Sequence, residues 1–253
     1  MLSDRQRDIL TLVEAEGAQY IETLAARYGL TTQTIRRDIN ELCDLGYARR
    51  FHGGVDAPVE ARNLSINARA ALNSLAKQRI ARKVAATITP GSTVFMGIGS
   101  TVQFVAQALR EHDGLRVVTN NIDVALMLCD APQVEVHMTG GTLRHNDRDV
   151  VGTDTLQFFE KFYASYAIVG AGALDAAKGI LDFSYSEAQT TSTLIANART
   201  SFLVADTSKW ARNASVRVVP FNRIDTFFTD AVPDRNAEQA LADSGIDVVL
   251  CAD

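Results

Sequence analysis

Between residues 3 and 45, apolar positions recur with the period of an α-helix and predict three short helices. Gly29 is placed to end the second helix, since glycine is the usual residue just beyond a helix C-terminus. Thr31 or Thr32 caps the third helix, which is expected to run to about Leu45. The spacing of three short helices with one tight turn is typical of small DNA-binding domains.

A β-hairpin is predicted directly after these helices. Tyr47 to Phe51 resembles a short strand, and Gly53-Gly54 resembles the turn that returns the chain. Helices followed by such a hairpin outline a winged helix-turn-helix, which we assign to residues 1–57. Residues 58–73 contain Pro58 and lack a strong period, so they are expected to form a linker.

From residue 74 to residue 253 the pattern alternates between helices and strands. Such alternation predicts an α/β domain with a mainly parallel sheet covered by helices. Helices are expected around Ile80–Ile88, Val102–Leu109 and Ile122–Leu128. Strands are expected at Thr93–Ile98, Arg116–Thr119, Glu135–Thr139, Tyr166–Ala171, Ser201–Asp206, Ile224–Thr229 and Asp247–Cys251.

Composition narrows the class of protein. The hydrophobic fraction is 47% of 253 residues, which suffices for a buried core. No apolar run approaches the ~20 residues of a membrane helix, and the N-terminus has no secretion signal. Three widely spaced cysteines form neither a disulfide framework nor a zinc motif. A reduced, cytoplasmic protein without metal or cofactor is therefore expected.

The net charge of −5 does not favour nucleic-acid binding, so the positions of the charges must decide. In the third helix Ile35, Ile39 and Leu42 fall on one side. The opposite side presents Gln33, Arg36, Arg37 and Asn40 at helical spacing. These side-chain types form hydrogen bonds with phosphates and base edges in a major groove.

An alternative is that Arg36 and Arg37 form a solvated face paired with Asp38 or Glu41. The preceding helix, the tight turn and the following basic hairpin favour DNA binding instead. The hairpin would grip the flanking backbone or the minor groove. The residues predicted to contact DNA are Thr32, Gln33, Thr34, Arg36, Arg37, Asn40, Arg49, Arg50 and His52.

A ligand site is predicted where strands of the larger domain end. Gly97-Ile98-Gly99-Ser100-Thr101 follows a strand and opens a helix, so backbone N–H groups and hydroxyls can hold an anion. Alone, such a loop is equally well explained by helix capping. Further polar residues follow other strands, where ligands of parallel sheets bind. The effector-binding residues predicted are Gly99, Ser100, Thr101, Asn120, Asn121, Gly140, Gly141, Arg144, Asp175, Glu187 and Lys209.

Two segments of the N-terminal region resemble the DeoR family of bacterial repressors. They are Thr34-Ile35-Arg36-Arg37-Asp38-Ile39-Asn40-Glu41-Leu42 and Arg50-x-His52-Gly53-Gly54. The resemblance continues through Gly99-Ser100-Thr101, Thr119-Asn120-Asn121, Gly140-Gly141-x-Leu143-Arg144 and Asp206-x-Ser208-Lys209. It implies operator DNA as one partner and a sensor domain similar to sugar-phosphate isomerases. Because one winged helix-turn-helix offers only a small interface with DNA, a homo-oligomer of at least two chains is also expected.

The resemblance also implies a phosphorylated sugar or polyol as effector. Leu181-Asp182-Phe183-x-Tyr185-x-Glu187 is closest to members that control glycerol-3-phosphate regulons, which makes glycerol-3-phosphate a candidate. Gly97 departs from the family, because many members carry Asp there. The missing carboxylate removes a hydroxyl acceptor and leaves the identity of the effector open.

Two other functions fit the same pattern. An isomerase-like enzyme needs a base near its substrate, and Glu187 or Asp175 could serve, but no nucleophile motif or metal cluster accompanies them. An activator would have the same two domains as a repressor, and the sequence does not separate the two. The regulated genes, the operator sequence and any assembly beyond a dimer are also left open.

Overall fold

The computed structural model describes residues 2–45, 47–56 and 66–251. The chain forms two compact units, residues 1–73 and residues 74–253. Half of the predicted linker, residues 58–65, lies outside the described residues, and its last part contains a helix, α4 (Ile66–Ala71). Among the described residues, every helix is too short or too polar to cross a lipid bilayer.

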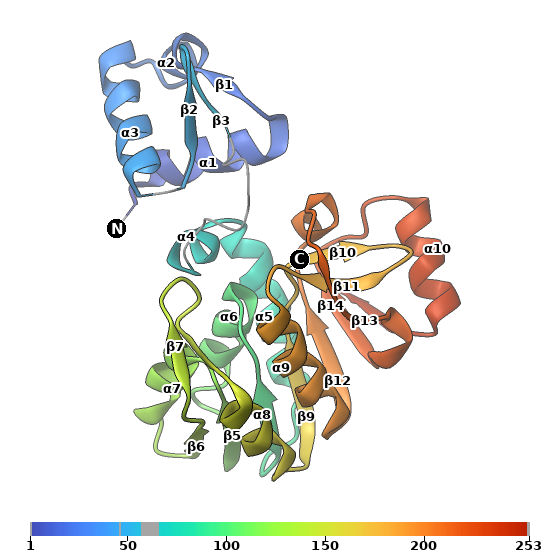
Figure 1. Cartoon of the computed structure of the whole chain (residues 1–253). Coiled ribbons are helices and arrows are strands. Elements are labelled where there is room, and N and C mark those ends of the chain that lie inside the picture. Colours follow the sequence, from blue (N-terminus) through green and yellow to red (C-terminus); the bar gives the residue numbers. More distant parts are fainter. Residues whose placement is uncertain (1, 46, 57–65, 252–253) are drawn as a thin grey trace. The chain divides into compact units, whose positions relative to one another are not determined.

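Besides α4, the first unit contains three helices and a small antiparallel sheet (Figure 1). Its further elements are α1 (Asp4–Glu16), β1 (Gln19–Tyr20), α2 (Ile21–Tyr28), α3 (Thr32–Asp44), β2 (Arg49–Phe51) and β3 (Gly54–Asp56). The three predicted helices and the hairpin β2–β3 are confirmed. Strand β1 was not predicted, because two residues are too few to show a period, yet it pairs with β3.

The core of the first unit comes from the apolar stripes of its helices. Ile9 of α1, Leu24 of α2 and Ile35 of α3 are all fully buried. Ser3 and Gln6 form the predicted capping box at the start of α1. The Thr31 hydroxyl accepts the N–H of Thr34 and so begins α3. Local capping and helical spacing therefore account for the helices of this unit.

The second unit contains a seven-stranded sheet in the order β15-β14-β12-β9-β4-β5-β6, with every pair parallel. The strands are β4 (Thr93–Met96), β5 (Leu115–Thr119), β6 (Val134–Met138), β9 (Ala164–Val169), β12 (Ala198–Val204), β14 (Thr226–Thr229) and β15 (Asp247–Leu250). This sheet confirms the predicted parallel α/β architecture. All seven predicted strands are present, with ends shifted by a few residues.

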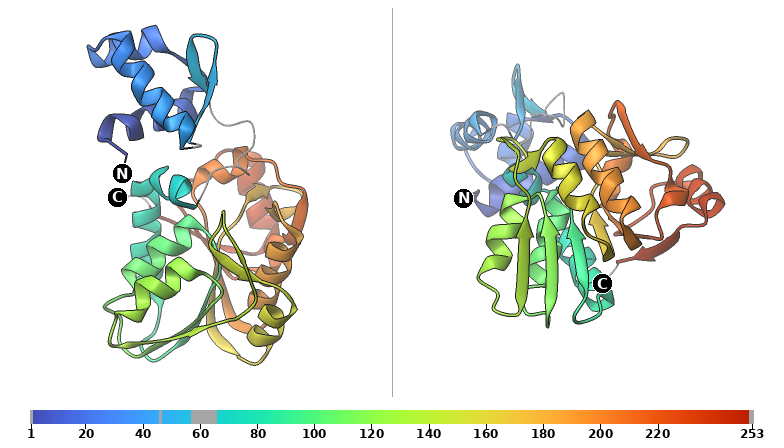
Figure 2. Two further views of the ribbon diagram at one scale, coloured as in Figure 1. Left: turned by 60° about the vertical axis from the view of Figure 1, so that its left-hand side comes forward. Right: turned by 60° about the horizontal axis from the view of Figure 1, so that its bottom comes forward.

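Helices cover both faces of this sheet, as Figures 1 and 2 show. They are α5 (Ser74–Thr87), α6 (Ser100–Ala108), α7 (Ile122–Cys129), α8 (Thr153–Glu160), α9 (Tyr185–Ala196) and α10 (Arg235–Ser244). Two apolar cores result. One includes Ile80 of α5 and Val105 of α6, and the other includes Phe159 of α8 and Leu194 of α9.

Two smaller sheets were not predicted. A hairpin is formed by β7 (Thr142–Arg144) and β8 (Asp149–Val151). A second antiparallel sheet contains β10 (Ala173–Asp175), β11 (Gly179–Asp182) and β13 (Val216–Val219). Their strands have three or four residues, too short for alternation to be distinguished from a loop. Two short 3₁₀ helices, η2 (Thr207–Ala211) and η3 (Phe221–Arg223), complete the unit.

Candidate functional site

Helix α3 exposes the polar stripe predicted from its sequence. Gln33, Arg36, Arg37 and Asn40 are exposed, whereas Ile35 lies in the core on the opposite side. Thr32 is also exposed at the first turn. Thr34 is half-buried, and its hydroxyl lies 3.0 Å from that of Thr31 within the helix cap. The structure therefore uses Thr34 to begin the helix.

The acidic neighbours of the two arginines are bound elsewhere. Asp38 accepts hydrogen bonds from Arg5 of α1, and Glu41 accepts one of 2.8 Å from Gln6. Neither Arg36 nor Arg37 has a hydrogen-bond or ion-pair partner in the part of the chain that the structure describes. The alternative in which Asp38 or Glu41 neutralises them is therefore wrong, and their positive charge faces solvent.

The hairpin β2–β3 supports a second basic region. Arg50 and His52 are exposed, but Arg49 forms an ion pair of 3.1 Å with Asp56 across the hairpin. The Phe51 ring packs on Tyr20, with ring centroids 5.3 Å apart, and this contact fixes the hairpin against the strand before α2. The hairpin thus presents Arg50 and His52 to solvent.

In the second unit the predicted anion loop lies where the order of strands reverses. The chain passes from β4 to one side through β5 and β6, and to the other side through β9 and β12. Such a reversal is the usual ligand position of open parallel sheets. Ser100 and Thr101, 5% and 4% exposed, begin α6 here. A side chain on Gly170, after β9, would lie 3.0 Å from the Ile98 carbonyl oxygen, so the two loops are in close approach.

The residues after β5 connect this loop to the hairpin β7–β8. Asn121 caps α7 through its side-chain oxygen and donates to the Gly97 carbonyl at 3.4 Å. Asn120 donates to the Val150 carbonyl at 3.0 Å. The other side-chain atom of Asn120, Oδ1, is buried and has no partner among the described residues. A buried carbonyl oxygen without a donor suits a ligand hydroxyl.

Arg144 joins the hairpin to α9. It donates to both carboxylate oxygens of Asp149 at 3.0 and 2.8 Å, and it also donates to Glu187. Asp147 lies 3.7 Å away in the hairpin turn. Gly140 and Gly141 precede Arg144 and are exposed. The sequence predicts Arg144 as an effector-binding residue, and the structure surrounds it with carboxylates.

The acidic residues around Arg144 have shifted pKa values. Burial, together with a hydrogen bond and charge repulsion from Asp182, raises the pKa of Glu187 well above its usual range, although Arg144 opposes the shift. Burial also raises the pKa of Asp149 to about 6. Hydrogen bonds and charges from these two acids raise the pKa of Arg144 against the effect of its own burial. The acidic groups around Arg144 therefore keep protons to a higher pH than free carboxyl groups do, and their oxygen atoms can accept hydrogen bonds from hydroxyls.

A closed series of contacts runs around the strand ends. It passes from the Gly97 loop through Asn121, Asp149, Arg144, Glu187 and Asp182 and returns through Gly172 and Gly170. We call these residues, together with Ser100, Thr101 and Asn120, the strand-end ring. It brings together predicted residues from four separate segments.

Two buried lysines lie near the end of β12, the strand that pairs with β9. Lys77 of α5 and Lys209 of η2 are 3% and 7% exposed, and both charges act on Asp206. Lys77 Nζ lies 3.9 Å from an Asp206 carboxylate oxygen. These charges lower the pKa of Asp206, although burial opposes the shift. Two buried cations and one carboxylate leave a net positive charge, which suits a phosphate.

Sequence reasoning missed Lys77 and Asp149. A signal for Lys77 was present, because it lies on the same helical face as Ile80, Ala81 and Val84, where a lysine is unusual without a buried partner. Asp149 directly precedes two apolar residues in an unpredicted strand. Its partner Arg144 is set by the hairpin register, which the sequence does not show.

Asp175 does not join the strand-end ring. It lies at the turn of the hairpin β10–β11, whereas Asp182 lies at the other end of β11, roughly 10 Å away by strand geometry. Its carboxylate accepts the N–H groups of Ala177 and Lys178 and pairs with Lys178 Nζ at 2.9 Å. These hydrogen bonds lower its pKa. The predicted role of Asp175 in reading effector hydroxyls is therefore not supported by its position.

Comparison with known proteins matches both units to one family. Residues 5–60 match the DeoR-like helix-turn-helix domain, and residues 72–231 match the DeoR C-terminal sensor domain. Ribose 5-phosphate isomerase A from Methanocaldococcus jannaschii aligns over 55% of each chain, with 13% identity and a TM-score of 0.41.

Two relatives from Escherichia coli K12 align over nearly the whole chain. The glycerol-3-phosphate regulon repressor is 38% identical over 98% of this chain and 99% of its own. The transcriptional repressor CsqR is 35% identical over 97% of this chain and 94% of its own. These relatives are named as repressors, which supports a regulator over an enzyme or an activator. The chain belongs to the DeoR family of transcriptional repressors, with a DNA-binding helix-turn-helix and a sensor domain.

Proposed function

We propose that this protein represses a carbohydrate or polyol operon and is released from operator DNA by a phosphorylated sugar or polyol. The observation that carries the proposal is the position of the Ser100–Thr101 loop at the strand reversal, on the same edge as Lys77 and Lys209. In this proposal the N–H groups of the loop hold the phosphate, and the lysines offset its charge.

The hydroxyls of the effector would be read by the acidic part of the strand-end ring. Asn120 Oδ1 and the Asp182 carboxylate supply acceptors there, and the protonated Glu187 carboxyl group can both donate and accept. Glycerol-3-phosphate is the first effector to test, because a relative with 38% identity is named for that regulon. Larger sugar phosphates form the comparison set.

DNA binding is assigned to the exposed stripe of α3, with Arg50 and His52 on the flanking backbone. One such domain covers few base pairs, so specific binding requires two half-sites and hence at least a dimer. We assign the dimer contacts chiefly to the second unit. Light scattering that shows only monomers, with and without operator DNA, would contradict this assembly.

The ligand binds the low-affinity conformation more tightly, because an effector shifts an equilibrium only by its differential affinity. Operator DNA selected from a random pool should therefore be released by glycerol-3-phosphate or by a larger sugar phosphate. Lys209→Ala should keep DNA affinity but need about ten- to a hundredfold more effector, as expected from loss of one charge-assisted contact.

Calorimetric titration tests the site directly. Wild type, Lys209→Ala and the exposed-face control Lys83→Ala are each titrated with glycerol-3-phosphate and with pentose and hexose phosphates. Equal affinity of wild type and Lys209→Ala would show that the site is misplaced. If no phosphorylated compound binds wild type, the proposed effector class is wrong.

A further inference from the structure

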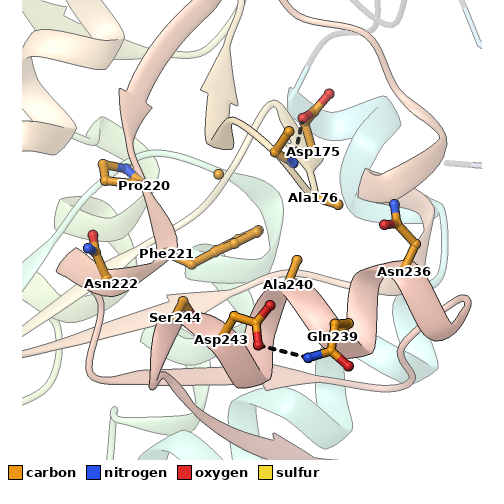
Figure 3. Close-up of a pocket in the computed structure, with 12 residues that line it drawn as sticks. Asp175, Ala176, Pro220, Phe221, Asn222, Asn236, Gln239, Ala240, Asp243 and Ser244 are labelled. Atoms are coloured by element: carbon orange, nitrogen blue, oxygen red, sulfur yellow. Dashed lines mark hydrogen bonds between the residues drawn. The ribbon is translucent and has the colours of Figure 1, made fainter.

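A hollow of the sensor unit lies beside η2. It has a volume of about 550 Å³ and is lined by η2, the β10–β11 turn and the start of α10. A neighbouring hollow, also of about 550 Å³, shares Asp175, Ala176 and Asn236 with it and is drawn in Figure 3. Volumes of this size match small-molecule sites. Neither hollow includes a residue of the strand-end ring.

The indole N–H of Trp210 is a hydrogen-bond donor that lacks an acceptor among the described residues. Trp210 lines the hollow beside η2, and its Nε1 atom is buried without a hydrogen-bond partner among the described residues. The ring packs on Phe221 at a centroid distance of 5.7 Å, so the side chain is held in place. A buried donor of this kind normally has an acceptor, which a ligand can supply.

The charges around the hollow are already compensated within the protein. Asp175 pairs with Lys178 and with the amides of its own turn. Asp234 caps α10 by accepting the Ala237 N–H at 2.9 Å, so the helix N-terminus holds a carboxylate. The Arg212 charge acts on Asp206. A phosphate would meet no uncompensated cation here and would be repelled by Asp234.

The groups left for a ligand are uncharged. The side-chain amides of Asn213 and Asn236 line the hollow and have no hydrogen-bond partner among the residues described. Figure 3 shows Asn236 at the first turns of α10, on the side of the Asp175–Ala176 segment. Two amides and an indole N–H beside an aromatic ring match the hydroxyls and C–H faces of a neutral sugar or polyol.

We propose that this hollow, the Trp210 hollow, binds an uncharged sugar or polyol, separately from the phosphorylated effector. Helix η2 contributes to both sites, because Lys209 on it acts on Asp206 and the next residue, Trp210, lines the hollow. Occupancy of the hollow would restrain η2 and so change the position of Lys209. The binding site itself does not depend on the proposed effector site.

Trp210 is the single tryptophan of the chain, so its fluorescence reports directly on the hollow. The full chain is titrated to high millimolar concentration with glycerol, sorbitol, glucose, galactose and ribose, none of which carries a phosphate. At least one compound should give a saturable change in emission. Asn236→Ala and Asn213→Ala should each weaken that binding about two- to tenfold, the cost of one neutral hydrogen bond. Asn222→Ala, an amide that lines only the neighbouring hollow, is the matched control and should bind as wild type does.

Two further variants separate this site from the effector site. Trp210→Phe keeps an aromatic ring but removes the donor, and calorimetry should show weaker binding of the same compound. Ser100→Ala should leave binding of the neutral compound unchanged, whether or not it weakens binding of sugar phosphates. Absence of any saturable response, or its loss in Ser100→Ala, overturns the proposal. An emission change produced by concentrating the protein alone would instead assign the hollow to contact with a second copy of the chain, and also overturns it.

Discussion

Arg5 holds Asp38 of helix α3 through two hydrogen bonds, from Nε to Oδ2 at 2.7 Å and from a terminal nitrogen to Oδ1 at 3.2 Å. This pair fastens α1 to the helix that presents the polar stripe. Because Asp38 is paired with Arg5, it does not serve as a counter-charge for Arg36 or Arg37. One contact between residues far apart in sequence therefore orients the helix and leaves its arginines unneutralised.

Loss of the Arg5 side chain should weaken DNA binding without removing a DNA contact. In Arg5→Ala, Asp38 loses its partner and becomes available to the α3 arginines, so operator affinity and the unfolding midpoint of the first unit should both fall. Fluorescence anisotropy and thermal unfolding measure the two effects. Arg5→Ala combined with Asp38→Ala should recover part of the DNA affinity, because the freed carboxylate is then absent. A double variant no better than the single one would contradict this explanation.

Arg36→Ala and Arg37→Ala should each weaken operator binding while the fold survives. A contact with a base edge should cost about 1–3 kcal/mol and relax sequence preference. A phosphate contact should instead weaken binding to all sequences and reduce the salt dependence. Arg235→Ala, at the start of α10 in the second unit, controls for loss of a positive charge. Unchanged affinity in both α3 variants would show that α3 is not the recognition helix.

Lys77→Met should affect both stability and phosphate binding. Removing one partner of a buried ion pair lowers the free energy of unfolding by on the order of 3–5 kcal/mol. Because Lys209 still acts on Asp206, the loss should be about 3 kcal/mol. Effector affinity should fall at least about tenfold, as for other charge-assisted contacts. Lys83→Met, on the exposed face of the same helix, is the matched control. Denaturant unfolding and calorimetry provide the readouts, and an effect on stability alone would make Lys77 purely structural.

The stability of the sensor unit should fall as pH rises from about 4 to neutral. The pKa of Asp149 is raised to about 6, and that of Glu187 is raised well above its usual range. In this window the folded protein keeps protons that the unfolded chain releases near pH 4, so the free energy of unfolding decreases with increasing pH. The lowered pKa of Asp206 acts in the opposite direction, but only at more acidic pH.

Glu187→Gln should flatten this dependence, because the amide cannot ionise. Thermal unfolding of the full chain between about pH 5 and pH 8 compares Glu187→Gln with wild type and with Glu111→Gln, which changes an exposed residue. An equally steep dependence in Glu187→Gln would show that other groups cause it.

Gly141 and Gly152 allow the effect of backbone strain to be separated from that of a clash. Both have positive φ, 144° and 133°, which alanine adopts at a cost of about 1–3 kcal/mol. At Gly152 nothing lies within 4 Å of an added side-chain carbon, whereas at Gly141 the Val151 carbonyl oxygen is 2.8 Å away. Gly141→Ala should therefore cost at least about 1 kcal/mol more than Gly152→Ala in denaturant unfolding. Similar costs would indicate that the hairpin β7–β8 shifts freely.

The sequence alone determined the elements whose signals are local. The stripe of Ile35, Ile39 and Leu42 predicts which side of α3 is buried and hence which polar side chains are exposed. Alternating helices and strands predict the parallel sheet, and the glycine- and hydroxyl-rich loop predicts the start of α6. Helical periodicity, capping and strand burial act over a few residues, so a single sequence contains them.

Only the tertiary structure decided which of the polar residues lie together. It paired Asp38 with Arg5, placed Lys77 beside Asp206, and put Asp175 at the far end of a hairpin. It also turned Arg144 toward carboxylates through a hairpin register absent from any local pattern. These pairings join segments far apart along the chain, and they depend on sheet order and on side-chain burial. Periodicity along a sequence does not contain that information, because many arrangements of the same elements satisfy the same local preferences.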